Sequence, residues 1–162
     1  MKTLTFNPKI LTFSEKVRLS CSSCRHYGKK ASCPPYIESV EYYSKVLLTY
    51  KHGILILKQY QISNRQNDAI GRESSLDMYD TLNKLKIMLF NQGHYSSFIL
   101  GGGSCKHCVE CPVPNCSAPN KRIIPIEATG VDVVALVKKI TNKTIKFPVD
   151  KSFYRIGVIL YD

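Results

Sequence analysis

Seven cysteines are the residues of this sequence whose type and spacing point most directly to chemistry. They divide into two groups along the chain. The first cysteine group is Cys21, Cys24 and Cys33. The second cysteine group is Cys105, Cys108, Cys111 and Cys116. Thiolates at such short spacings can surround a metal ion or an iron–sulfur cluster, so both groups are candidate metal-binding sites.

The second group resembles the cysteine run of a bacterial ferredoxin. Cys105, Cys108 and Cys111 repeat its two-residue spacing, although Cys116 follows after four residues rather than three. Structural zinc usually takes two cysteine pairs separated by a dozen or more residues. We therefore predict a 4Fe-4S cluster here, with zinc and free thiols as alternatives. The preceding glycines, residues 101–103, allow a close approach of the backbone, and His107 is expected to be an exposed spacer.

The first group leaves one coordination position open, because Cys21 and Cys24 form a metal knuckle that only Cys33 extends. The fourth ligand can be His26, a water, a substrate, or a sulfur from the second group, as in two-cluster ferredoxins. A buried set of three thiols without metal is the alternative. We expect the two groups to lie close together at one end of the sheet.

Hydrophobic periodicity predicts three helices and three strands around these groups. The helices are expected over residues 40–52, 74–93 and 132–140, with Ser39 and Asp132 as N-caps and a capping box at Ser74. Short apolar runs predict strands over residues 54–60, 96–100 and 155–161. The polar segment 61–73 is expected to be a loop.

This order predicts an α/β (or α+β) fold for a single metal-binding domain, residues 1–162. Strands that alternate with helices favour a small, mostly parallel sheet with about three helices. The second cysteine group follows the strand over residues 96–100, which we take as a central strand. Ligand sites in such sheets gather at the carboxyl ends of the strands.

Composition narrows the class of protein. The chain has 162 residues, and 44% of them are hydrophobic, which is ordinary for a globular domain. No apolar run approaches the ~18 residues that span a bilayer, and Asn7-Pro8 interrupts the segment where a signal peptide would be apolar. We expect a soluble cytoplasmic protein, in which reduced thiols are more common than disulfides.

The formal net charge of +11 favours acidic partners. Two metal centres, each of about −2, would lower this charge only to about +7. Acidic partners include nucleic acid, but the sequence carries no nucleic-acid-binding motif. We therefore expect an acidic redox protein or a larger enzyme as the partner, and no membrane.

Several segments of the chain carry a resemblance to a known family. These are Cys21-x2-Cys24, YG, CPP at Cys33, GGGSC with the second cysteine group, and EATGVDV. In this order they resemble an uncharacterised family of bacterial and archaeal predicted metal-binding proteins. The resemblance implies metal binding and no assigned reaction. The segment KRIIPIEA departs from the family pattern, which leaves the roles of Arg122 and Pro125 open, and a helix start explains Glu127 and Asp132.

The sequence therefore predicts an iron–sulfur protein that transfers electrons or senses redox state beside a larger enzyme. Two alternatives remain. One is an interaction module in which zinc is structural, and the other is an enzyme whose open coordination site at the first cysteine group binds substrate. No Ser/His/Asp set, phosphate-binding loop or dinucleotide fingerprint indicates a reaction.

Overall fold

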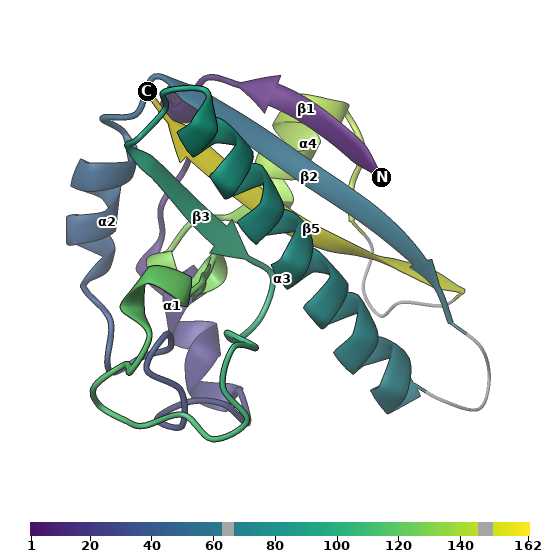
Figure 1. Ribbon diagram of the computed structural model, residues 1–162. Helices are drawn as coiled ribbons and strands as arrows, with labels where there is room; N and C mark the ends of the chain where they lie inside the picture. The colour runs from purple at the N-terminus through teal and green to yellow at the C-terminus, as the bar shows by residue number, and fades with distance from the viewer. Residues whose placement is uncertain (63–66, 146–150) are drawn as a thin grey trace.

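The computed structural model of the protein describes residues 1–62, 67–145 and 151–162. Its strands are β1 (Lys2–Phe6), β2 (His52–Gln61), β3 (Ser97–Gly101), β4 (Ile124–Pro125) and β5 (Ser152–Tyr161). Its α-helices are α1 (Glu15–Leu19), α2 (Val40–Leu47), α3 (Asn67–Asn91) and α4 (Val133–Thr141). Short 3-10 helices are η1 (Pro8–Ile10), η2 (Ser20–Ser23), η3 (Pro119–Lys121) and η4 (Glu127–Thr129). Figure 1 shows the sheet above two long loops that fill the lower left of the molecule.

The five strands form one mixed sheet in the order β1-β2-β5-β3-β4. Three neighbouring pairs are antiparallel, namely β1 with β2, β2 with β5, and β5 with β3. Only β3 and β4 pair in parallel, through Leu100 opposite Ile124 and Gly101 opposite Pro125. The fold is therefore α+β, and the prediction of a mostly parallel sheet is wrong.

The physical reason for this error lies in the last strand. β2 and β3 do run in the same direction, as a connection through α3 requires, because both are antiparallel to β5. They are not neighbours, however, since β5 inserts between them and pairs with both. The sequence pattern indicates where strands lie, but not which strand fills the space between two others. The order strand–helix–strand is thus compatible with a split βαβ unit as well as with a parallel sheet.

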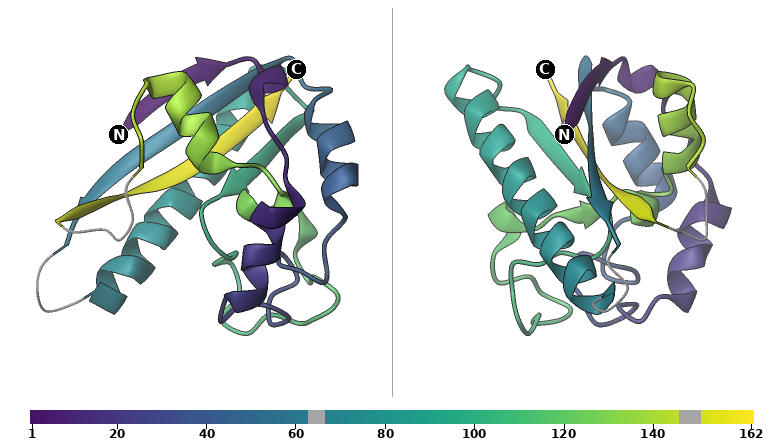
Figure 2. Two further views of the ribbon diagram at one scale, coloured as in Figure 1. Left: turned by 180° about the vertical axis from the view of Figure 1, so that it is seen from behind. Right: turned by 90° about the vertical axis from the view of Figure 1, so that its right-hand side faces the viewer.

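Helices cover both faces of the sheet, as the right-hand view of Figure 2 shows. Successive strand residues point to opposite faces, so Leu55 and Val158 pack with α2 and α4 whereas Ile56 and Ile159 pack against α3. Both faces of β2 and β5 are therefore buried. The second cysteine group follows β3, which is an interior strand of the sheet, between β5 and β4.

The structure has four α-helices within its described residues, one more than predicted. The additional helix is α1, which Ser14 caps by accepting a hydrogen bond from the N–H of Lys16. The predicted N-caps Ser39 and Asp132 are confirmed for α2 and α4. None of the helices in the described ranges is both long enough and apolar enough to cross a bilayer.

Helix α3 begins earlier than predicted. Its bounds are Asn67–Asn91, so the predicted loop over 61–73 is wrong from residue 67 onward, and residues 63–66 of that loop lie outside the described residues. The predicted capping box at Ser74 is also wrong, because Ser74 is buried inside the helix. Its hydroxyl donates to the carbonyl of Gly71 and accepts from the Arg155 side chain. A partner on β5 therefore satisfies this serine, which the local sequence pattern cannot reveal.

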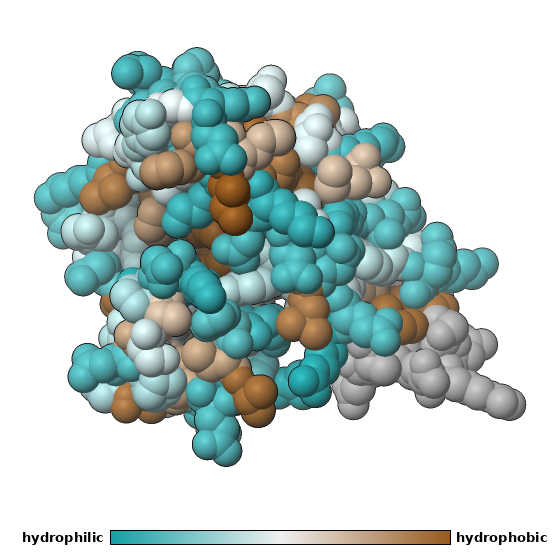
Figure 3. Space-filling view, in the orientation of Figure 1, coloured by the Kyte–Doolittle hydropathy of each residue, from teal (hydrophilic) through white to brown (hydrophobic). Residues whose placement is uncertain are grey.

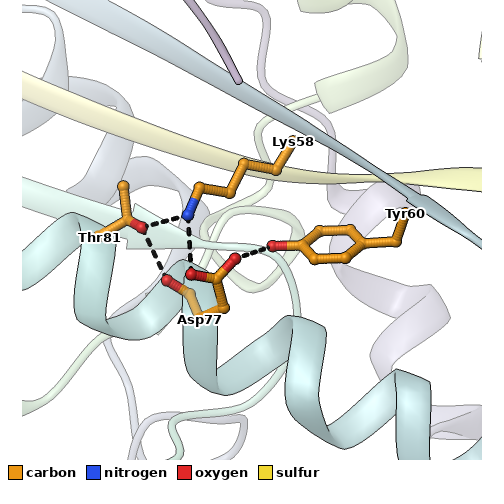
Figure 4. Close-up of polar contacts among 4 residues, drawn as sticks. All are labelled: Lys58, Tyr60, Asp77 and Thr81. Carbon is orange, nitrogen blue, oxygen red and sulfur yellow. Dashed lines mark hydrogen bonds and ion pairs between the residues drawn. The ribbon is translucent and has the colours of Figure 1, made fainter.

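A group of polar side chains attaches α3 to β2 (Figure 4). The ammonium of Lys58 donates to the Asp77 carboxylate at 2.8 Å and to the Thr81 hydroxyl at 2.6 Å. Tyr60 donates its hydroxyl hydrogen to the same carboxylate. The hydrogen bond from Lys58 lowers the pKa of Asp77, so this carboxylate stays ionised, and burial raises the pKa of Tyr60. These contacts fix the helix on the sheet beside the cysteine loops.

We predict that the packing of α3 on the sheet makes a large contribution to stability. Leu82 is fully buried between α3 and the sheet, whereas Ile87 on the same helix is 61% exposed. Leu82→Ala should lower the free energy of unfolding by about 2–5 kcal/mol because it leaves a cavity. Ile87→Ala should change it by less than about 0.5 kcal/mol. Urea unfolding checks both variants, and equal losses would show that α3 does not pack as described.

Candidate metal centre

The second cysteine group lies on the long loop that joins β3 to β4. At the start of this loop, Gly103 has a φ of 90°, a left-handed conformation that glycine adopts without strain. Gly102 extends the contact with β5 by donating its N–H to the carbonyl of Ile156 at 2.9 Å. Beyond it, all four cysteines line one small cavity, Cys105, Cys108, Cys111 and Cys116. One loop thus brings four thiols to a common space.

The first cysteine loop contacts this same cavity. The N–H of Ala31 donates to the sulfur of Cys111 at 3.2 Å, and the N–H of Cys105 donates to the hydroxyl of Ser32 at 3.3 Å. Lys30 extends its ammonium to the carbonyl of Cys108 at 3.3 Å. These hydrogen bonds confirm the prediction that the two cysteine groups lie close together.

The loop of the first group is closed by its own hydrogen bonds. Gly28 has a left-handed backbone, with a φ of 66°, and its N–H donates to the carbonyl of Pro34 at 3.0 Å. The Tyr36 hydroxyl donates to the Gly28 carbonyl at 3.2 Å. On the other side, Arg18 of α1 donates to the carbonyls of Ile37 and Ala128, each at 3.3 Å. This arginine holds the helix that leads into Cys21 and Cys24.

The three cysteines of the first group differ in exposure. Cys33 is only 6% exposed, Cys21 is half-buried and Cys24 is exposed. Burial raises the pKa of the Cys33 thiol to about 11, although the hydrogen bond with Ser32 opposes this shift. Burial also raises the pKa of Cys21, and the nearby charge of Glu127 adds to the effect. Both sulfurs therefore keep their protons near neutral pH unless a metal ion replaces them.

The histidines near the cysteines occupy different positions. His26 lies next to the first group, where its backbone N–H donates to the sulfur of Cys24 at 3.5 Å. Burial lowers the pKa of His26, and Lys106 lowers it further, so its imidazole is neutral as a metal ligand must be. His107 is exposed, as predicted, and its ring stacks against Tyr79 with centroids 6.3 Å apart.

Positive side chains surround the two loops. Burial lowers the pKa of Lys106, and repulsion from Arg155 and Lys30 acts in the same direction. Lys106 donates to the Ser104 hydroxyl at 3.2 Å, and Arg122 donates to the carbonyl of Ala31 at 3.4 Å. The cysteine loops are thus held in an electropositive setting, which can offset the negative charge that thiolate ligands bring to a metal centre.

The distances between the potential metal ligands limit which kind of metal centre these side chains can bind in this arrangement. Four sulfurs around one zinc at ~2.3 Å are about 3.8 Å apart. In the described parts of the chain, no three His, Cys, Asp or Glu side chains converge closely enough to hold a single metal ion. The sulfurs of the second group nevertheless share one cavity.

Sequence reasoning identified the cysteines but missed the groups that support them. Ala31, Ser32 and Arg122 line the cavity of the second group although they are distant from it in sequence. Ser32 is 1% exposed, and in the sequence only its position directly before Cys33 pointed to it. Glu127 starts a 3-10 helix, as its predicted role at a helix start suggests, but it is also partly buried near Cys21, and burial raises the pKa of its carboxyl.

One of three comparisons with known proteins finds a match. No curated protein and no solved structure matches the chain at a significant level. A family model described as a predicted metal-binding protein (DUF2284) matches residues 5–161, which confirms the resemblance found in the sequence. The chain therefore belongs to the DUF2284 family of predicted metal-binding proteins.

Proposed function

We propose that this protein is an iron–sulfur protein and that the second cysteine group holds a 4Fe-4S cluster. The observation that carries the proposal is the shared cavity of four thiols from one short loop, Cys105, Cys108, Cys111 and Cys116. Four thiolates are the usual ligands of a 4Fe-4S cluster, and the first three here have ferredoxin spacing. The hydrogen bond from the N–H of Ala31 to Cys111 is of the kind that tunes cluster potentials.

The donor spacing supports a cluster more than zinc. A zinc ion draws its ligands to one point, whereas a cubane of four irons binds each sulfur at a separate corner. The second group has four thiols around one space without the convergence that a single ion needs. We take the sharing of one space by four thiols as support for a cluster.

The first cysteine group is proposed as a second metal site. Cys21, Cys24 and Cys33 act on one another electrostatically, and the charge of Cys105 also reaches Cys33. A fourth ligand from the neighbouring loop, from His26 or from a bound molecule would complete the site. Two alternatives to an iron–sulfur protein remain. The protein can be an interaction module with structural zinc, or an enzyme that binds substrate at the open position of the first cysteine group.

A 4Fe-4S cluster accepts and donates single electrons, and the protein would use it for electron transfer or redox sensing. The chain's own groups would tune that chemistry. The N–H of Ala31 and the ammonium of Lys30 place positive charge near the cavity of the second group, which favours the reduced state. The net charge of +11 favours an acidic redox protein or an acidic surface of a larger enzyme as partner, and a reducing compartment such as the cytoplasm would keep the thiols available.

We predict about four iron and four sulfide ions per chain after purification without oxygen, or about eight of each if both groups hold clusters. The protein should be brown, with a broad visible absorption that bleaches on reduction. Metal analysis and an acid-labile sulfide assay check this outcome. Stoichiometric zinc without sulfide would refute the iron–sulfur proposal and support the zinc alternative.

We predict that Cys108→Ser destabilises the metal-loaded protein far more than substitutions of its neighbours. The loss of one ligand opens the centre, so the free energy of unfolding should fall by more than ~3 kcal/mol. The matched controls are His107→Ala and Val109→Ala, whose side chains are exposed, Val109 to 93%. Each control should lie within about 0.5 kcal/mol of the parent protein.

Thermal unfolding and iron content measured on the same samples check this prediction. Loss of iron in Cys108→Ser, with full retention in both controls, is the expected pattern. Equal unfolding transitions and equal iron content for the three variants would show that Cys108 is not a ligand.

A further inference from the structure

A cavity of about 640 Å³ opens beside the cysteine groups and is separate from the small cavity that the four thiols share. Its walls come from both cysteine loops, from the first turns of α3 and from β5. In Figure 3 the surface is indented between the cysteine loops at the lower left and the start of α3 at the lower right, and mostly hydrophilic residues border it. Ligand-binding pockets of proteins typically measure ~300–1,000 Å³, so this cavity has room for a small molecule.

The charged residues that line this cavity are arginines and lysines, and His26, which also lines it, becomes positive when it is protonated. Among the residues that the structure describes with side chains, its lining includes no aspartate and no glutamate. Five cationic side chains line it instead, Arg25, Lys30, Arg72, Lys106 and Arg155. Among the side chains that the structure describes, which exclude those of residues 63–69 and 146–150, the ion pairs are Lys45 with Glu41 and Lys58 with Asp77, and neither involves a cation of this cavity.

Neutral groups hold three of these cations in place, and one of them is Lys106, which donates to the Ser104 hydroxyl at 3.2 Å. Arg155 donates to the Ser74 hydroxyl at 3.0 Å and to the Gly71 carbonyl at 2.8 Å. Lys30 donates to the carbonyls of Cys108 and Val109, at 3.3 and 3.4 Å. Such hydrogen bonds orient the side chains without neutralising their charge. These cations are therefore held in defined positions by neutral groups, and the charge of Glu127 also acts on Arg155.

The cysteines do not account for this charge. Cys24, Cys105 and Cys108 also line the cavity. A 4Fe-4S centre with four thiolates carries only about −2, which is less than the five lining cations supply. A surplus of positive charge remains at the cavity when a centre is present, and an anionic ligand is the simplest partner for it.

We propose that this cavity binds a small molecule that carries phosphate groups. Arginine guanidinium groups form paired hydrogen bonds with phosphate oxygens, and lysines add point charges. A phosphate group can carry two negative charges, which suits several cations around one space better than a single carboxylate does. The site goes beyond the proposed electron-transfer role, and it does not depend on which metal the cysteines hold.

The test is calorimetric titration of the metal-loaded, full-length protein with inorganic phosphate at about 0.15 M salt, where surface charges are screened beyond ~8 Å. Binding to one site is expected. Arg72→Gln/Lys106→Gln should weaken it at least about tenfold, since two charge-assisted contacts are lost. The matched control, Lys138→Gln/Lys143→Gln, removes the same charge from exposed residues in and after α4, on the other face of the sheet, and should stay within about twofold.

Three outcomes would overturn the proposal. They are the absence of one-site binding to the parent protein, equal weakening by both double variants, and tighter binding of succinate, a dicarboxylate, than of phosphate. Iron content and circular dichroism are measured on every variant.

If the double variant loses metal, Arg72→Gln alone is used, because Arg72 is exposed on α3. That variant should weaken phosphate binding about threefold or more, and unchanged binding would overturn the proposal. A protein that holds zinc yet binds phosphate would contradict the iron–sulfur proposal and leave this one intact.

Discussion

The pairing of β5 with two strands at once is the constraint on which the rest of this structure depends. β5 bonds along its length to β2 and, through its last residues, to β3. Its residues Val158 to Leu160 are fully buried, so the strand contributes apolar contacts to both layers of helices. Because β3 is fixed on β5, the loop that follows β3 starts from a rigid point. Arg155 of the same strand then reaches the first turns of α3 and completes the wall of the basic cavity.

The cysteine loops lack regular strands, so they depend on one another for order. Backbone N–H groups of each loop find acceptors on the other, as between Ala31 and Cys111 and between Cys105 and Ser32. Buried polar groups left without such partners would cost ~1–3 kcal/mol each. The two metal-binding candidates are thus coupled mechanically, and a change of charge at one is felt at the other, as the influence of Cys105 on Cys33 shows.

Local features of this fold were predictable from sequence, and long-range pairings were not. Caps such as Ser39 and Asp132 act within one turn, so a few residues determine them. The proximity of the two cysteine groups followed from their chemistry. By contrast, β1 was missed because its alternating pattern is short. The antiparallel pairing of β5 was not predicted, because the partners of a strand depend on all the strands of the sheet. The cations of the cavity come from four distant segments, which no local spacing indicates.

The central position of β5 has a consequence for biosynthesis. This strand, Ser152–Tyr161, follows β2 and β3 in the sequence, so it leaves the ribosome after both of them. Until then β2 and β3 have no common partner, and the loop that carries the second cysteine group has no fixed origin. A nascent chain at ~5–20 residues per second therefore exposes all seven cysteines for several seconds before the sheet can close. The sheet that anchors the second cysteine group therefore closes only after all seven cysteines have been synthesised.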